Sequence, residues 1–443
     1  MKRVSNINLN KVAFISAALL SATIVQADIA IDSQLDYEVT GYFADSAGQN
    51  QETQRVNNSL ALEVEVFNSW NDGDESITFK PFYRIDEMDD ERSHGDVREL
   101  IWNKVADDYE LKIGVGKVFW GVTESAHLVD IVNQTDGVES LDGEEKLGQP
   151  MVQVLLEREW GNLDLFVLPY FRERTFAGKD ARLSAGLDYA DAEYESSAEE
   201  KHVDVAVRWS HYWEDLEYAV SVFHGTSRDA VLGIDAEAAL TGLTSGEYIP
   251  YYAQISQLGI ELQYLNEGWA WKFEGIHREG MPELASYSLV TSSLNTDCLT
   301  CEVSNPFPQL GYVVEEDKGY FATAAGFEYT QVGIFESRMD LGWVAEHIYD
   351  SRQEDANVGA FEHDVLLANR WVANDEADSE LLVGVIYDYE YEDYSLSIEG
   401  NTRLFDGLSF EIEARVFSPS RDNVTQYSLR DEDLVKMTFS YYL

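Results

Sequence analysis

Stretches that alternate apolar and polar residues recur along most of this chain. Residues 59–66 (SLALEVEV), 202–209 (HVDVAVRW) and 408–416 (LSFEIEARV) are three examples. A period of two, with apolar side chains on one face and charged side chains on the other, is typical of a strand with one buried face. The pattern predicts about eighteen such strands, beginning near Gln34 and continuing to the last residues.

The connections between these strands are alternately short and long. Hairpin-type residues mark eight short turns, at 71–74, 107–108, 161–162, 214–215, 266–268, 332–333, 374–375 and 405–407. Longer connections separate them, including 121–148, 175–201, 226–252, 279–318, 348–361 and 418–433. Short turns at one end and long loops at the other are typical of an outer-membrane barrel, whereas a soluble sandwich has no reason to sort its loops. We therefore predict an all-β fold, a transmembrane antiparallel β-barrel of about 18 strands with short periplasmic turns and long extracellular loops.

The N-terminal segment has the features of an export signal. Lys2, Arg3 and Lys11 are positive, residues 12–25 are mostly apolar, and small residues lead to a cleavage motif at 25–27. The apolar run is too short for a membrane anchor. We expect residues 1–27 to be a signal peptide and residues 28–443 to form the barrel.

Charge narrows the choice of partners. The leader holds three of the 31 Lys and Arg residues and none of the 82 Asp and Glu residues, so residues 28–443 carry a formal net charge of −54. This charge repels phosphate and excludes nucleic acid as a partner. The 25 Tyr, 20 Phe and 10 Trp residues argue against the disorder that high acidity alone would suggest, and they suit ordered strands.

The inward face of the strands, assigned by alternation, carries charges of both signs. The residues that we expect in the wall are Lys80, Arg84, Lys112, Arg172, Arg174, Arg208, Lys272 and Arg370, with Glu63, Glu65 and Glu157 among the acids. Such charges either pair across strands and stiffen the wall or set up a field that orients polar solutes crossing it. Both roles are compatible.

The overall pattern, the leader and an alternating terminal strand resemble Gram-negative outer-membrane porins across nearly the whole chain. Locally, residues 116–121 (GKVFWG) and 168–174 (LPYFRER) are similar to segments of an uncharacterised porin-like proteobacterial family. The terminal strand departs from the usual pattern because it ends in Leu443 rather than Phe. The resemblance implies location in the cell outer membrane, contact with lipid and lipopolysaccharide, passage of small polar solutes and recognition by the barrel-assembly machinery, without a cofactor. The oligomeric state stays open.

Residues 121–148 interrupt the alternation and form the third outer connection. In porins the third outer loop folds into the lumen and narrows it, and the resemblance implies the same here. Glu124, His127, Asp130 and Asp136 would then edge a pore constriction. The alternative is that the segment only covers the mouth of the barrel.

Two further motifs have alternative interpretations. Ser125, His127 and Asp130 are the residue types of a hydrolase triad, but at spacings of two and five they lie on different sides of a helix. Cys298 and Cys301 have the spacing of half a zinc site, yet no second pair exists and exported thiols are oxidised, so we expect a disulfide and no metal.

These observations together predict a porin rather than an enzyme. We expect passive diffusion of small polar solutes with a modest preference for cations, because acidic residues outnumber basic ones in the wall and at the mouth. Two alternatives stay open: a barrel that exports an acidic polysaccharide, which the wall arginines would favour, and an outer-membrane hydrolase barrel.

Overall fold

The structure is a computed structural model that describes most of the chain. It covers residues 29–46, 52–140, 142–184, 186, 188–234, 247–282, 285–290, 309–314, 319–352, 362–389, 392–419 and 429–443. The expected signal peptide and both cysteines, Cys298 and Cys301, lie outside the described residues. The expectations for them therefore stay predictions.

Eighteen strands form one antiparallel sheet that closes on itself, because the last strand pairs with the first. In ring order the strands are β1 (Ala30–Tyr42), β2 (Val56–Trp70), β3 (Glu75–Asp86), β4 (Gly95–Val105), β5 (Glu110–Gly116), β6 (Gln149–Arg158), β7 (Gly161–Leu168), β10 (Asp204–Trp213), β11 (Leu216–Thr226), β14 (Gln254–Asn266), β15 (Trp269–Glu279), β18 (Tyr320–Gln331), β19 (Asp340–Asp350), β20 (His363–Val372), β21 (Glu380–Asp388), β22 (Asp393–Phe405), β23 (Leu408–Ser418) and β24 (Leu434–Tyr442). Closure leaves this sheet without an exposed edge, so its backbone groups are paired between strands. The predicted fold class is confirmed.

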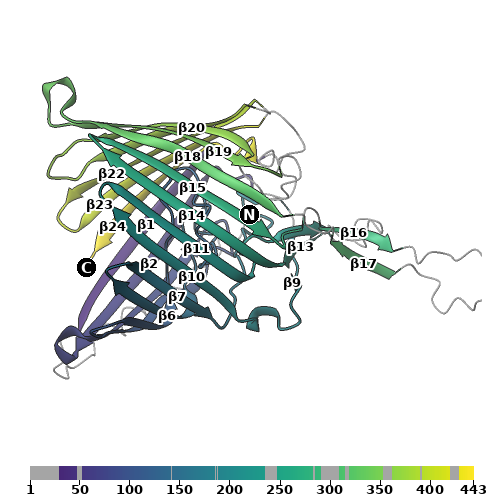
Figure 1. Cartoon of the computed structure of the whole chain (residues 1–443). Helices are drawn as coiled ribbons and strands as arrows, with labels where there is room; N and C mark the ends of the chain where they lie inside the picture. The colour runs from purple at the N-terminus through teal and green to yellow at the C-terminus, as the bar shows by residue number, and fades with distance from the viewer. Residues whose placement is uncertain are drawn as a thin grey trace, which may run out of the picture.

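The two ends of the barrel differ (Figure 1). The end that we call the short-turn end carries the tight connections and the C-terminus. The opposite, long-loop end carries a small sheet of β8 (Asp188–Tyr189), β9 (Glu193–Tyr194), β12 (Val231–Ile234) and β13 (Glu247–Tyr252), and the hairpin of β16 (Ala285–Val290) and β17 (Gln309–Val314). The described helices are three short 3-10 turns, η1 (Asn71–Gly73), η2 (Glu199–Lys201) and η3 (Ile334–Glu336). None of the helices in the described part of the chain has the length and apolar character needed to span a bilayer.

The side chains of the sheet are distributed inside out compared with a water-soluble protein. On β14, Leu258, Ile260 and Leu262 point outward with exposed fractions of 44%, 39% and 37%, while Glu261 between them points inward at 2%. The same alternation exposes aliphatic and aromatic residues on strands all around the ring. A continuous apolar outer face is costly in water and is the surface that a bilayer stabilises.

Aromatic side chains gather near both ends of this apolar face. Trp269 stacks on Trp271 and on Tyr329 beside the β14–β15 turn, at the short-turn end. His363 stacks on Tyr349 and Tyr389 at the long-loop end. Rings of aromatic residues at the two interfaces are expected of a barrel that crosses a membrane.

Two strands end earlier than the alternation predicts. The pattern extends to Trp120 in the sequence, but β5 ends at Gly116, and β7 ends at Leu168 directly before Pro169. Proline has no N–H to donate to the ladder, so it ends the pairing there. The placement of Arg172 and Arg174 in the barrel wall is therefore wrong, since both residues lie in the connection that follows β7.

Candidate channel and its constriction

The connection between β5 and β6 enters the barrel and is held there by two buried glutamates. The Glu274 carboxylate on β15 accepts hydrogen bonds from the backbone N–H groups of Val122 and Thr123 at 2.7 and 2.9 Å. Glu346 on β19 accepts from the N–H groups of Glu124 and Ser125 at 2.9 and 2.8 Å, and from the Ser125 hydroxyl at 2.6 Å. A carboxylate that accepts several N–H groups satisfies backbone that would otherwise lie unpaired inside the barrel.

The later part of the same connection is hydrogen-bonded to other strands of the wall. Arg98 on β4 donates to Asp136 at 2.6 Å, and Arg84 on β3 donates to Glu139 at 2.9 Å. From β23, Arg415 donates to Asp142 at 2.6 Å. Anchors on β3, β4, β15, β19 and β23 show that the segment crosses the interior of the ring and does not only cover its mouth.

On one side of the interior the segment packs against apolar residues of the wall. Val129, Ile131 and Val132 of the segment are 0%, 2% and 0% exposed, and they join a cluster with inward residues of β7, β11, β14 and β15. Gly259 on β14 permits this close approach, since a Cβ at that position would lie 3.1 Å from Val129 Cγ1 and 2.4 Å from Ser221 Oγ on the neighbouring strand β11. Burial of these side chains contributes about 1.5–3 kcal/mol each, so the segment is packed as well as tethered.

On another side of the interior, against other strands of the wall, lies an open, charged cavity of about 800 Å³. Its walls come from β1–β4 and β20–β24, and its floor from the side of the segment that carries residues 139–145. The acidic side chains that line it are Asp36, Glu38, Glu63, Glu124, Glu139, Asp142, Glu144, Glu145, Glu380, Glu399, Glu411 and Glu413, and the basic ones are Arg84, Arg98, Arg370, Arg415 and Lys436. Twelve acids against five bases give this space a negative potential.

Each of the five basic side chains is already paired with a carboxylate. Arg370 on β20 pairs with Glu124 of the segment, Arg415 donates to Glu413 at 2.9 Å, and Lys436 also pairs with Glu413. Arg84 and Arg98 pair with the segment, as described above. The positive charges are therefore neutralised locally, and the carboxylates in excess determine the electrostatic potential in the cavity.

The residues expected at the constriction divide into two groups. Glu124 lines the open cavity, and the His127 ring contacts the Glu144 carboxylate at 3.2 Å beside it. The side chains of Asp130 and Asp136 are instead 0% exposed and are held by Lys146 and Arg98. Both carboxylates hold the segment together, because each is buried against a base. Asp136 does not line the charged cavity, whereas Asp130 lies in the lining of a second, smaller cavity of about 230 Å³.

Two groups on the segment have shifted acid–base behaviour. Burial alone would lower the pKa of His127, but the hydrogen bond and charge of Glu144 raise it above the ordinary value. Burial would raise the pKa of Asp142, but the Ser140 hydroxyl and the charge of Arg415 hold it below its usual range. Asp142 therefore keeps its negative charge at the cavity under mildly acidic conditions.

The remaining expected wall residues lie on inward faces, apart from the two arginines corrected above. Lys80 pairs with Glu65 at 2.9 Å and lies 3.9 Å from Glu63. Lys112 pairs with Glu110, Arg208 pairs with Glu261, and Lys272 pairs with Glu328. Glu157, the last of these wall residues, is exposed near the end of β6. The corrected Arg172 donates to Asp96 at 2.8 Å, and the Arg174 guanidinium lies 5.9 Å from the centre of the Phe176 ring.

Alternation did not assign Arg98 to the interior, although it is 3% exposed and anchors the segment. The β3–β4 register shifts between Lys80 and Pro81, where Lys80 pairs with Glu99 and Pro81 pairs with Val97. This bulge lets Arg98 and Glu99 both point inward, against the strict period of two. A proline inside an otherwise regular strand is the sequence signal that could have located it.

Strand pairing defines the class of protein, a closed transmembrane β-barrel, and the contacts of the connection between β5 and β6 place this segment inside it. Comparison with solved structures finds an outer membrane protein and a porin. OmpT, an outer membrane protein of Vibrio cholerae in trimer form, is 9% identical with a TM-score of 0.43, over 94% of this chain and 99% of that chain. A variant of the Rh. blastica porin is 8% identical with a TM-score of 0.40, over 94% of this chain and 100% of that chain. No family model matches the chain, and no curated protein matches it.

Proposed function

We propose that this protein is an outer-membrane porin through which small polar solutes diffuse passively, with a modest preference for cations. The observation that carries the proposal is the eccentric cavity of about 800 Å³, with its twelve carboxylates and five paired bases. Fixed charge on the wall of a narrow aqueous space enriches ions of the opposite sign. A path of this kind needs neither a cofactor nor an energy source.

The pairing of the basic side chains also bears on export of an acidic polysaccharide. A polyanion in the cavity would meet Arg370 and Arg415 already engaged with Glu124 and Glu413, and surplus carboxylates around them. Electrostatic repulsion would oppose its passage. We therefore favour cations and neutral solutes as the permeants.

Hydrolysis is also disfavoured by the contacts of the three residues considered for it. The Ser125 hydroxyl donates to Glu346, His127 contacts Glu144, and Asp130 pairs with Lys146. A catalytic triad needs its serine, histidine and carboxylate bonded to one another. We assign these side chains to the architecture of the segment.

Liposome swelling tests the proposal. Vesicles that contain the purified protein should swell in isosmotic solutions of small neutral sugars, and faster in a small cationic amino acid than in an anionic one of similar size. Protein-free vesicles are the control. Folded barrels that give no swelling with any small solute would refute passive diffusion.

A further inference from the structure

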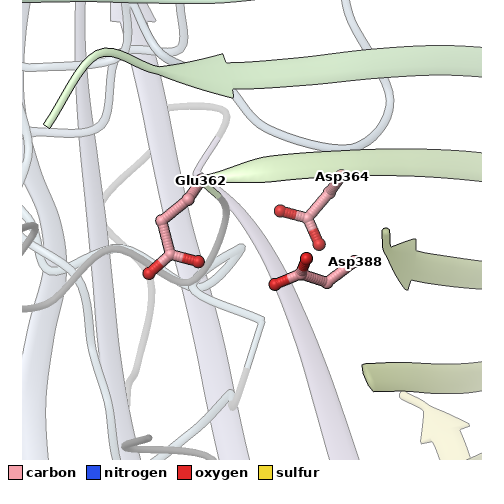
Figure 2. Close-up of side chains that lie close together, drawn as sticks. All are labelled: Glu362, Asp364 and Asp388. Atoms are coloured by element: carbon pink, nitrogen blue, oxygen red, sulfur yellow. The ribbon is translucent and has the colours of Figure 1, made fainter. Parts of the chain in front are cut away.

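Three carboxylates meet at the long-loop end of β20 and β21, away from the open cavity (Figure 2). Glu362 directly precedes β20, Asp364 lies in it, and Asp388 ends β21. One carboxylate oxygen from each residue lies within 4.8 Å of the others. Asp364 and Asp388 are direct cross-strand partners, and they are only 4% and 9% exposed.

The arrangement leaves a buried acceptor without a donor. Asp364 Oδ2 is inaccessible to solvent and has no hydrogen-bond partner among the described residues, and Figure 2 shows this carboxylate pointing towards the other two. Within the described residues Asp364 forms no ion pair, since Arg352 at the end of β19 pairs with Asp350 instead. A buried carboxylate with an unsatisfied oxygen costs several kcal/mol unless a cation or a proton meets it.

A fourth carboxylate strengthens the repulsion. Asp393 on β22 is the cross-strand partner of Asp388 and is 6% exposed, so aspartates stand in one row across β20, β21 and β22. Like charges directly opposite each other destabilise a sheet. A bound cation or a shared proton would relieve this repulsion.

The donor chemistry selects the kind of ion. The three groups offer only carboxylate oxygens, which are the ligands of hard cations, and Ca²⁺ accepts six to eight oxygens in flexible geometry with mono- or bidentate carboxylates. Mg²⁺ demands a nearly ideal octahedron and keeps most of its water. The adjacent His363 stacks on Tyr349 and Tyr389 on the outward face, so it cannot supply a nitrogen ligand.

We propose that Glu362, Asp364 and Asp388 bind a Ca²⁺ ion that ties β20 to β21 at the long-loop rim. Each carboxylate contributes at least one oxygen, and water completes the coordination shell. The proposal is independent of solute passage, because it concerns the stability of the rim and holds whether or not the barrel conducts.

Thermal unfolding of the purified, detergent-solubilised barrel tests this site. Millimolar Ca²⁺ should raise the melting temperature of the wild-type protein over that in EDTA, with affinity in the range of about 10⁻⁴–10⁻³ M that is usual for extracellular sites. Asp364→Asn should abolish the Ca²⁺-dependent rise and, because it removes repulsion, should melt at or above the wild type in EDTA. Asp388→Asn is the second variant and should behave in the same way. Glu217→Gln, at an exposed carboxylate on β11, is the matched control and should keep the full rise.

Three outcomes would overturn the proposal. A wild-type melting temperature that does not respond to Ca²⁺ but increases on acidification would show that the cluster shares a proton instead. A full Ca²⁺ response in both Asp364→Asn and Asp388→Asn would place the ion elsewhere. A response to Mg²⁺ at least as large as that to Ca²⁺ would show that the cluster does not select the larger ion.

Discussion

Replacing Glu274 and Glu346 with glutamine should release the infolded segment without changing its sequence. Both carboxylates are almost fully buried and together bind the backbone N–H groups of residues 122–125. Glutamine keeps one acceptor oxygen but loses the charge, and it turns an NH₂ group towards a donor. Charged hydrogen bonds contribute about 1.5–3 kcal/mol, against about 0.5–1.5 kcal/mol for neutral ones. Each substitution should therefore destabilise the state in which the segment is attached to the wall by about 1–3 kcal/mol relative to the detached state. If the two costs add, the double variant favours detachment by about 30-fold or more.

Single-channel recording in planar bilayers measures this release. The Glu274→Gln/Glu346→Gln variant should show a larger mean conductance or frequent steps to a higher level, because the narrowest part of the lumen dominates the resistance. Glu65→Gln is the matched control, since Glu65 lies on the inward face of β2 and pairs with Lys80, whose other ion-pair partners, Glu63 and Glu99, are also on the wall. A folded double variant with wild-type conductance and noise would refute the view that the segment narrows the path.

Three further perturbations probe the same account. Glu411→Lys exchanges a cavity carboxylate for a cation, and it should lower the cation preference in bilayer reversal-potential measurements, whereas an unchanged potential would exclude this part of the wall from the ion path. The pKa of His127 is raised by Glu144, so the attraction of this pair is fully present below the unfolded-state pKa of about 6.5 and is lost as pH rises through the higher folded-state value. Cation preference should therefore increase from pH 5.5 to pH 8.5 by more in the wild type than in His127→Asn, and equal pH dependence in the two proteins would contradict this role. Gly259→Ala puts a Cβ 2.4 Å from Ser221 Oγ and 3.1 Å from Val129 Cγ1, so both side chains must shift, and the melting temperature should fall by the equivalent of about 1–3 kcal/mol of packing. An unchanged melting temperature would show that Ser221 and Val129 move aside without loss of stability.

Most of the fold could be predicted from the sequence because the signals for strands and turns are local. Alternation follows directly from the pleat, and the residues of tight turns follow from their backbone angles, so seven of the eight short turns lie at or beside the predicted positions. The eighth was predicted at 161–162, but these residues begin β7 and the turn lies at 159–160. The ends of strands were harder to predict from the sequence. Residues 117–120 alternate without belonging to a strand, since alternation cannot distinguish a segment paired in a sheet from an extended segment inside the lumen.

The roles of individual charges could not be derived from the pattern. Asp136 and Glu124 belong to one acidic segment, yet Asp136 is buried against Arg98 while Glu124 faces the open cavity. That difference depends on where the segment lies across the ring, and this in turn depends on contacts with residues more than two hundred positions away, such as Glu346. Long-range packing of this kind leaves no periodic signal in the chain.

Reversal potential across a KCl gradient tests the central claim most directly. A tenfold gradient gives about 59 mV for an ideally selective pore, and the surplus carboxylates predict a value of cationic sign below that limit. Charges at the mouth are screened within about 8 Å at physiological salt, so the potential should shrink as both solutions are concentrated but should keep its sign, because the wall charges lie within the narrow path. A potential of anionic sign that persists at high salt would contradict the account, since it would show that the arginines of the lumen and not its carboxylates control the passage.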